Sequence, residues 1–244
     1  MTVDTVTLEP DRIAAELRAH AERCGIAIAE DRYEPLAKYC SLLWEWNGKI
    51  NLTRHTTPEL FVKRDLLDTW QLVQHIEHNE RVLDFGSGCG VPGLTAAILR
   101  PDLRLQLCDS VQKKARVLED IVAKLKLQIK VNSTNVTAVL PRDRFDTLTA
   151  RAVGSISKMC TWLQPHWSRF GRLLTIKGPS WVDERGEARH LGQLHGIDLR
   201  KRAEYPMPDR DGQSVILQMS LQINDEDGGG LEGDDREAVG QKLE

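Results

Sequence analysis

Glycines stand at alternate positions in one segment of the chain that could do chemistry, Asp84-Phe85-Gly86-Ser87-Gly88-Cys89-Gly90-Val91-Pro92-Gly93. They leave no side chains between the backbone and a ligand lying over it, and glycine readily accepts the positive φ angles of such a turn. The segment follows a short strand-like run and leads into an apolar helix-like run. It therefore predicts a tight turn that binds a cofactor.

The turn alone leaves two classes of cofactor open. Its Gly-x-Gly-x-x-Gly spacing satisfies the dinucleotide fingerprint, and Asp109 follows Gly88 by 21 residues, near the ~20 expected for an acid that holds a ribose. Methyltransferases that use S-adenosylmethionine have the same turn and the same acid. Asp84, just before Gly86 and placed to meet the charged amino acid part of that cofactor, favours the methyl donor. Asp109 has a second interpretation, as a cap of the helix that follows it.

Short apolar strands alternate with helices around this turn, a pattern typical of a parallel sheet covered on both faces. We expect strands at 81–85, 103–108, 128–132, 146–151 and 172–177, and helices at 93–99, 111–127, 155–166 and 181–195. Two further runs, 197–204 and 213–221, have only a turn-rich loop between them, which predicts an antiparallel hairpin. The sequence thus predicts an α/β, Rossmann-like fold with a seven-stranded, mostly parallel sheet and an antiparallel last strand.

Amphipathic helices are expected before the sheet, over 8–24, 31–46 and 58–76. No linker follows them, so we expect residues 1–79 to form a helical cap packed on a cofactor-binding core at 80–224. Residues 225–244 hold eight acids, two bases and three adjacent glycines. Such a segment buries too little apolar surface to order itself, so we expect a disordered acidic tail.

Composition narrows the class of protein. The net charge is −3, but positions 1–224 hold 31 basic against 28 acidic residues, a balance compatible with nucleic acid. The five cysteines are widely spaced and form no Cys-x-x-Cys pair, which argues against a disulfide framework and a zinc site. No targeting segment or apolar run of ~18 residues is visible. We expect a cytoplasmic monomer that uses neither metal nor membrane.

Six motifs together resemble one bacterial family, the small-subunit (16S) ribosomal RNA methyltransferase G family, which methylates N7 of a guanine in 16S rRNA. The resemblance extends over about residues 36–221. In chain order the motifs are Trp46-Asn47-x-x-x-Asn51-Leu52-Thr53, Lys63-Arg64-Asp65-x-x-Asp68-Thr69, Asp84-x-Gly86-x-Gly88-x-Gly90-x-Pro92-Gly93, Asp109-Ser110-x-x-Lys113, Arg151-Ala152 and Lys177-Gly178.

The resemblance implies a class I methyltransferase with S-adenosylmethionine as cofactor and 16S rRNA, or the small ribosomal subunit, as partner. It implies that Asp109 holds the ribose, that residues 135–137 lie along the adenine, and that Arg151 lies at the cofactor edge of the active site. The residues expected at the cofactor are Asp84, Gly86, Gly88, Gly90, Val91, Asp109, Ser110, Asn135, Val136, Thr137 and Arg151.

This chain departs from the family pattern at three positions. The family usually has Pro at Cys89, His at Asp65 and an acid at Thr137. Guanine N7 has a free lone pair and needs no general base, so catalysis is mostly alignment and stabilisation of changing charge. The ring becomes positive on methylation, and a nearby Asp65 carboxylate would favour that charge. Alternatively, Asp65 merely pairs with Arg64 or a neighbouring helix.

Three further residues are expected to act with Asp65 at the substrate. Arg151 suits a phosphate or the O6 edge of guanine, or else a buried salt bridge to an acid such as Asp84. Asn51 either orients a base or caps its own backbone. Lys177 is either a phosphate contact or an exposed strand end.

Other residues have only general signs of RNA binding. Trp44 and Trp46 either stack on an unpaired base or belong to the core. Six basic residues either contact phosphates or form a solvated helix face: Lys113, Lys114, Arg116, Lys124, Lys126 and Lys130.

We therefore expect an enzyme that transfers methyl from S-adenosylmethionine to guanine N7 of 16S rRNA. The alternatives are a methyltransferase of another RNA or a small molecule, a catalytically weak rRNA-binding assembly factor, and a dinucleotide enzyme.

Overall fold

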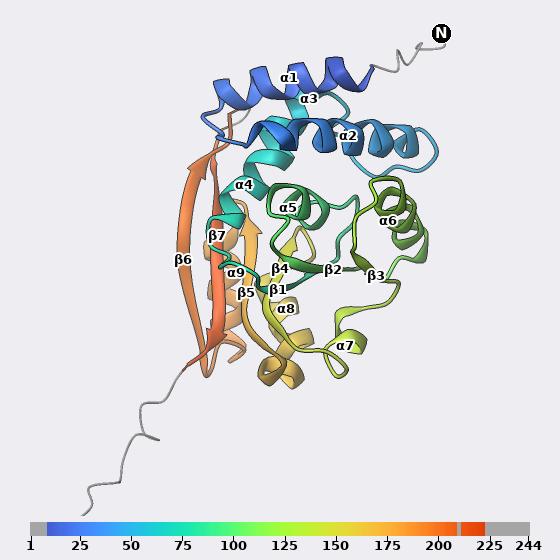
Figure 1. Cartoon of the computed structure of the whole chain (residues 1–244). Coiled ribbons are helices and arrows are strands. Elements are labelled where there is room, and N and C mark those ends of the chain that lie inside the picture. The colour runs from blue at the N-terminus through green and yellow to red at the C-terminus, as the bar shows by residue number, and fades with distance from the viewer. Residues whose placement is uncertain (1–8, 209–210, 223–244) are drawn as a thin grey trace, which may run out of the picture.

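A seven-stranded sheet with the order β3-β2-β1-β4-β5-β7-β6 organises the computed structural model, which describes residues 9–208 and 211–222 (Figure 1). Strands β1 to β5 pair in parallel, and β7 runs antiparallel to both of its neighbours. The predicted fold class is therefore confirmed. The predicted acidic tail lies outside the described residues. The strands are β1 Arg81–Phe85, β2 Arg104–Cys108, β3 Lys130–Asn132, β4 Phe145–Arg151, β5 Phe170–Lys177, β6 Ile197–Pro206 and β7 Gln213–Leu221.

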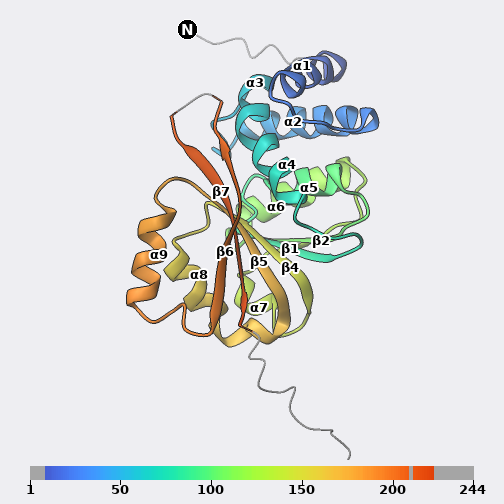
Figure 2. The same ribbon diagram turned by 90° about the vertical axis from the view of Figure 1, so that its left-hand side faces the viewer.

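Helices cover both faces of the sheet, as Figures 1 and 2 show. One face carries α4 (Leu67–Val73), α5 (Gly93–Leu99) and α6 (Gln112–Lys124); the other carries α7 (Val136–Val139), α8 (Ile156–Leu163) and α9 (Trp181–His190). Successive side chains of a strand point to opposite faces. Val82 accordingly lies in the core with α5 and α6, and Leu83 in the core with α7 and α8.

Two long N-terminal helices, α1 (Pro10–Arg23) and α2 (Tyr33–Asn47), lie over α5 and α6 (Figure 1). A short 3-10 turn, Glu30–Arg32, precedes α2. Leu17 and Leu43 of these helices are fully buried in the same hydrophobic core as Leu94 and Leu118. Each such leucine contributes roughly 1.5–3 kcal/mol through burial. The described helices before β1 and one face of the sheet therefore share a single core.

Several helices differ from the sequence prediction for local reasons. The helix expected at 155–166 ends at Leu163 and continues as a 3-10 turn, Gln164–Arg169, because Pro165 has no amide hydrogen for an α-helical bond. The helix expected at 181–195 ends at His190, two residues before Gly192, whose φ is +70°. The short α7 was not predicted; the side chain of Asn135 caps it by accepting a hydrogen bond from the Ala138 amide at 3.2 Å.

The helix expected at 58–76 is divided into three parts: α3 (Pro58–Leu60), a π-helical turn (Phe61–Leu66) and α4. Single π-helical turns inside α-helices frequently occur at functional sites. This turn contains Asp65 and faces the edge of the sheet where the parallel strands end. None of the helices within the described ranges combines the length and apolarity needed to cross a bilayer.

Candidate functional site

The glycine-rich turn after β1 is tied to the end of β2. The Gly88 amide donates a hydrogen bond to Asp109 Oδ2 at 2.8 Å. Gly86 has a φ of +66°, and a Cβ at this position would come within 2.7 Å of the Val153 side chain. Conformation and space therefore both require glycine at Gly86.

A cavity of about 350 Å³, here called the β1–β2 cavity, lies beside this turn. Its lining comes from the ends of β1, β2 and β4 and from the segment that leads into α7. Phe85, Val153 and Trp162 give it apolar walls. Six of the residues predicted for a cofactor line it: Gly86, Asp109, Ser110, Asn135, Val136 and Thr137.

The buried carboxylate of Asp109 joins the turn to helix α6. Its Oδ2 accepts from Gly88, and its Oδ1 accepts from the amide of Val111 at 2.8 Å. The helix cap predicted for Asp109 is not formed: α6 begins at Gln112 and has no side-chain cap, so Asp109 instead holds Val111, the residue before the helix. The same side chain lines the β1–β2 cavity, where a ribose contact stays a prediction.

Asp84 lies beneath the turn and does not line the β1–β2 cavity. It is fully buried, and its Oδ1 accepts from the Thr149 hydroxyl at 2.9 Å. Its Oδ2 has no hydrogen-bond partner in the described part of the chain, and a Cβ on Gly93 would lie 2.6 Å from that oxygen. Burial raises the pKa of Asp84 to about 6. The carboxylate thus lies against Gly93 at the start of α5 and does not reach the β1–β2 cavity.

The other predicted cofactor residues, Gly88, Gly90, Val91 and Arg151, are also outside the lining of the β1–β2 cavity. Gly90 faces α5, because a Cβ there would meet Leu94 at 2.8 Å, and Val91 is buried. The hydroxyl of Tyr39 on α2 donates to the Cys89 carbonyl at 2.9 Å, so an N-terminal helix holds the turn from the other side. Burial raises the pKa of Cys89 to about 11, which keeps this thiol neutral.

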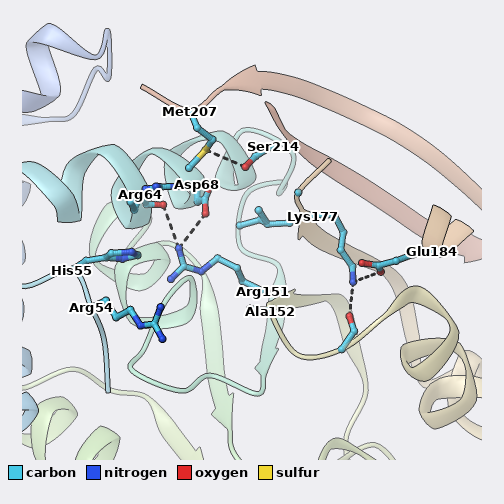
Figure 3. Close-up of a pocket in the computed structure, with 13 residues that line it drawn as sticks. Arg54, His55, Arg64, Asp68, Arg151, Ala152, Lys177, Glu184, Met207 and Ser214 are labelled. Carbon is cyan, nitrogen blue, oxygen red and sulfur yellow. Dashed lines mark hydrogen bonds and ion pairs between the residues drawn. The ribbon is translucent and has the colours of Figure 1, made fainter. Parts of the chain in front are cut away.

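A second cavity, of about 660 Å³, adjoins the first and is here called the Arg151 cavity (Figure 3). Ala152, whose φ is +56°, lines both cavities. Arg151 Nη2 lies 2.7 Å from Asp65 Oδ1, and Arg151 Nη1 lies 3.1 Å from Asp68 Oδ2. Burial opposes the charge of Arg151, but these two carboxylates raise its pKa above the ordinary value. The arginine is therefore a permanent cation in the cavity wall.

Asp65 lies behind Arg151, is fully buried and does not line the Arg151 cavity. Its Oδ2 lies 2.9 Å from Nδ1 of His55, so both carboxylate oxygens are engaged within the protein. Of the alternatives considered for Asp65, the structure gives pairing within the protein, but with Arg151 and His55. Equally, the buried partner of Arg151 is not Asp84, as one alternative held, but the pair Asp65 and Asp68.

Asp68 extends this network to the C-terminal hairpin. Its Oδ1 accepts from the hydroxyl of Tyr205 on β6 at 2.7 Å. Burial raises the pKa of Asp68, although Arg151 and Tyr205 act in the opposite direction. Residues from the π-helical turn, α4, β4 and β6 therefore meet in one hydrogen-bonded cluster at the cavity.

The loop between α2 and α3 places His55 and Arg54 at the cavity. Asn47 Oδ1 accepts from the amides of Leu52 and Thr53 at 2.8 and 2.9 Å, and the Trp44 indole donates to the His55 carbonyl at 2.9 Å. Asn51, expected at the substrate, is exposed and does not line the cavity.

Neither tryptophan of this region has a free indole nitrogen. The Trp44 indole donates to the His55 carbonyl in the loop, and the Trp46 indole donates to Asp120 Oδ2 on α6 at 2.7 Å. Both rings pack against the core as partly buried side chains.

Lys177 lies on the opposite wall from His55 and is 8% exposed (Figure 3). The alternative of an exposed strand end is therefore wrong. Its Nζ donates to the Gly154 carbonyl and to Glu184 Oε2, the latter at 2.7 Å. The same Glu184 oxygen accepts from the Ile156 amide at 3.0 Å. Lys177 and Glu184 thus hold the 152–156 turn that separates the two cavities.

Comparisons with known proteins decide the family. The family model described as rRNA small subunit methyltransferase G matches residues 32–206. A protein of Rhodopirellula baltica named "Ribosomal RNA small subunit methyltransferase G" is 51% identical over 195 residues, which cover 80% of this chain and 84% of that protein. The chain belongs to the rRNA small subunit methyltransferase G family. A Pseudomonas aeruginosa protein of the same name is 35% identical, covering 78% of this chain and 96% of its own.

Solved structures agree on the fold of this rRNA small subunit methyltransferase G family member. A methyltransferase from Pyrococcus furiosus superposes with a TM-score of 0.51 at 10% identity, covering 63% of this chain and 81% of its own. TrmK of M. capricolum, solved in complex with S-adenosyl-homocysteine, gives a TM-score of 0.50 at 16% identity, covering 63% and 67%. The fold is therefore that of a methyltransferase, and membership of the family makes this chain an S-adenosylmethionine-dependent methyltransferase of small-subunit (16S) rRNA, as predicted.

Sequence reasoning missed several residues of the two cavities, and no spacing pattern would have found them. His55 and Glu184 engage the predicted Asp65 and Lys177, and Trp162 faces the β1–β2 cavity. Asp68 was part of a motif but had no assigned role. In the described ranges, no group of three or more histidine, cysteine or acidic side chains is placed to hold a metal.

Proposed function

We infer that this enzyme methylates N7 of a guanine in 16S rRNA, with the cofactor in the β1–β2 cavity and the guanine in the Arg151 cavity. The observation that carries this proposal is the meeting of the two cavities at Ala152. A base in one cavity and a cofactor in the other can approach only at this junction. Alignment across it would supply most of the catalysis.

The lining of the β1–β2 cavity fits S-adenosylmethionine, which supplies an electrophilic methyl group when bound. The Asp109 carboxylate suits ribose hydroxyls, and the apolar walls formed by Phe85, Val136 and Val153 suit an adenine. Gly86 leaves room for the ligand to approach the turn. Asp84, Gly88, Gly90 and Val91 would act by shaping the turn rather than by touching the ligand.

Charges in the Arg151 cavity suit an acceptor that does not lose a proton. Its carboxylates are already used: Asp68 binds Arg151 and Tyr205, and Glu184 binds Lys177. The two carboxylates of the lining are therefore not free to act as a general base, and N7 of guanine needs none. Arg151 would donate to guanine O6, which lies beside N7.

We also propose that the protein acts as a cytoplasmic monomer, without a metal. In this proposal residues 1–79 serve as a helical cap on the core at 80–224, and residues 225–244 form an acidic tail. Asp65, Asn51 and Lys177 would act indirectly, by positioning Arg151 and the loops around the cavity.

The test is methyl transfer from labelled S-adenosylmethionine to naked 16S rRNA and to assembled small subunits. N7-methylguanine is then mapped by strand scission at the modified base. The expected result is label at one guanine, with calorimetric binding of S-adenosylmethionine but not of NAD. Label confined to another atom or another RNA would overturn the proposal.

A further inference from the structure

Hydrogen bonds of the backbone and of the ring hold His55 in the wall of the Arg151 cavity. Its carbonyl accepts from Trp44, its amide donates to the Thr53 hydroxyl at 3.0 Å, and its Nδ1 lies 2.9 Å from Asp65 Oδ2. Its side chain is 29% exposed and lines the cavity. In the part of the chain that the structure describes, no hydrogen bond uses its Nε2.

The contact with Asp65 determines what Nε2 can do. A carboxylate only accepts hydrogen bonds, so Nδ1 carries the hydrogen and donates it. In a neutral imidazole the other nitrogen is then an acceptor. Asp65 is itself held by Arg151 at 2.7 Å, so the position of the ring follows that of Arg151. In its neutral form His55 thus presents one oriented lone pair at the cavity.

Most polar side chains that line this cavity donate hydrogen bonds, and few can accept one from a ligand. Arg54, Arg64, Arg151 and Lys177 line it, and their side chains carry donors only. The carboxylates of the lining already face cations, as described above. Guanine presents acceptors at O6 and N7 but donors at N1 and at its N2 amino group. A pocket of arginines and lysines alone would leave those donors unpaired, which costs about 1–3 kcal/mol for a buried group.

The position of His55 selects one of these donors. Figure 3 shows Arg151 between His55 and Ala152, where the two cavities meet. The N2 amino group lies at the opposite end of guanine from N7. With N7 at the Ala152 junction and O6 toward Arg151, the amino group points to the wall that carries His55.

We propose that His55 is a specificity residue whose Nε2 accepts a hydrogen bond from the N2 amino group of the target guanine, and that Asp65 positions it. This assignment rests on the proposed guanine-N7 activity. In this assignment the buried Asp65 does not touch the substrate but positions His55 and Arg151, which do. Adenine has no N2 amino group and would leave Nε2 unpaired.

The test compares small-subunit rRNA carrying guanine or inosine at the target position, because inosine lacks only the N2 amino group. His55→Asn keeps a donor for Asp65 but removes Nε2. On guanine RNA we expect its kcat/KM to fall about 3- to 10-fold, as for one hydrogen bond. On inosine RNA, wild type and His55→Asn should differ by less than twofold. Asp65→Asn should reduce the preference for guanine in the same way, with no further reduction in the double variant.

Controls separate this inference from folding and from the proposed function. Thr56→Ala changes the exposed neighbour that does not line the cavity and should behave as wild type. Affinity for S-adenosylmethionine and the melting temperature of His55→Asn should stay near wild type. An equal loss on both RNAs, no loss on guanine RNA, or complete inactivity of wild type on inosine RNA would overturn the role of His55. Absence of N7-methylguanine from every RNA with wild-type enzyme would instead refute the proposed function.

Discussion

Replacing Arg151 by methionine should be among the most damaging single changes in the protein. The substitution keeps an apolar stem of similar length but removes the guanidinium from between two carboxylates. Asp65 is fully buried and Asp68 is 6% exposed, so the loss of the contacts at 2.7 and 3.1 Å leaves two carboxylates with little access to water. Removing one partner of a buried ion pair costs about 3–5 kcal/mol.

For a chain of this length, each 1 kcal/mol corresponds to roughly 2–4 °C in melting temperature, so we expect a decrease of roughly 6–20 °C. Urea denaturation at neutral pH measures the free energy directly. Arg142→Met is the matched control, since Arg142 is exposed on the turn before β4 and its side chain makes no hydrogen bond or ion pair within the described residues. It should change the unfolding free energy by less than about 0.5 kcal/mol.

The loss of stability in Arg151→Met should come from the two uncompensated acids. Adding Asp65→Asn and Asp68→Asn to Arg151→Met should therefore recover part of the stability, although each Asn substitution alone destabilises. Such non-additivity is expected for groups in one network. A loss below about 1 kcal/mol in Arg151→Met, or a triple variant with additive losses, would refute this account.

Three further predictions concern the cofactor turn and the wall between the cavities. Burial raises the pKa of Asp84 from 3.8 to about 6, so the folded state favours the protonated carboxyl, and the stability from this preference is lost as pH rises from 4 to above 6. Relative to Asp84→Asn, the unfolding free energy of wild type, measured by urea titration, should therefore fall by about 3 kcal/mol over this range. Parallel pH profiles of the two proteins would contradict the prediction. Gly86→Ala should weaken S-adenosylmethionine binding more than ~10-fold in calorimetry, because the added Cβ would meet the Val153 side chain. A second substitution, Val153→Ala, should restore part of the affinity. If it restores none, the loss comes from backbone strain and not from the contact with Val153. Glu184→Gln should destabilise the protein by about 1–3 kcal/mol and lower kcat, because buried Lys177 is left without its carboxylate partner. The control Glu187→Gln, at an exposed position of the same helix, should change neither the stability nor kcat. Equal effects of the two substitutions would argue against the Lys177–Glu184 contact.

The sheet and the cofactor turn were predictable because their signals are local. Apolar runs between turn residues located the strands, and the spacing of 21 residues between Gly88 and Asp109 is spanned in the structure by a hydrogen bond. The residues around Arg151 were harder, because its two acidic partners lie 86 and 83 positions upstream. No periodicity records such a contact.

The N-terminal loop could not be predicted in detail for a similar reason. The motif residue Asn51 was expected at the substrate, but Asn47 holds the loop, and this brings His55 to Asp65. The spacing of apolar residues over 58–76 also does not predict the π-helical turn. The loop is held by the Asn47 side chain, and the carbonyls of Arg64 and Asp65 in the π-helical turn accept hydrogen bonds from Arg151 and Thr69; composition and spacing reveal none of these bonds.

The bond from Tyr205 to Asp68 has a consequence for biosynthesis. Helix α2 leaves the ribosome before α5 and α6, against which it packs. The cluster around Arg151 can close only after residue 205 has emerged, because Tyr205 is one of its members. The contacts of Asp68 on α4 are therefore completed only after β6 has been synthesised, and an incompletely translated chain cannot assemble the Arg151 cavity.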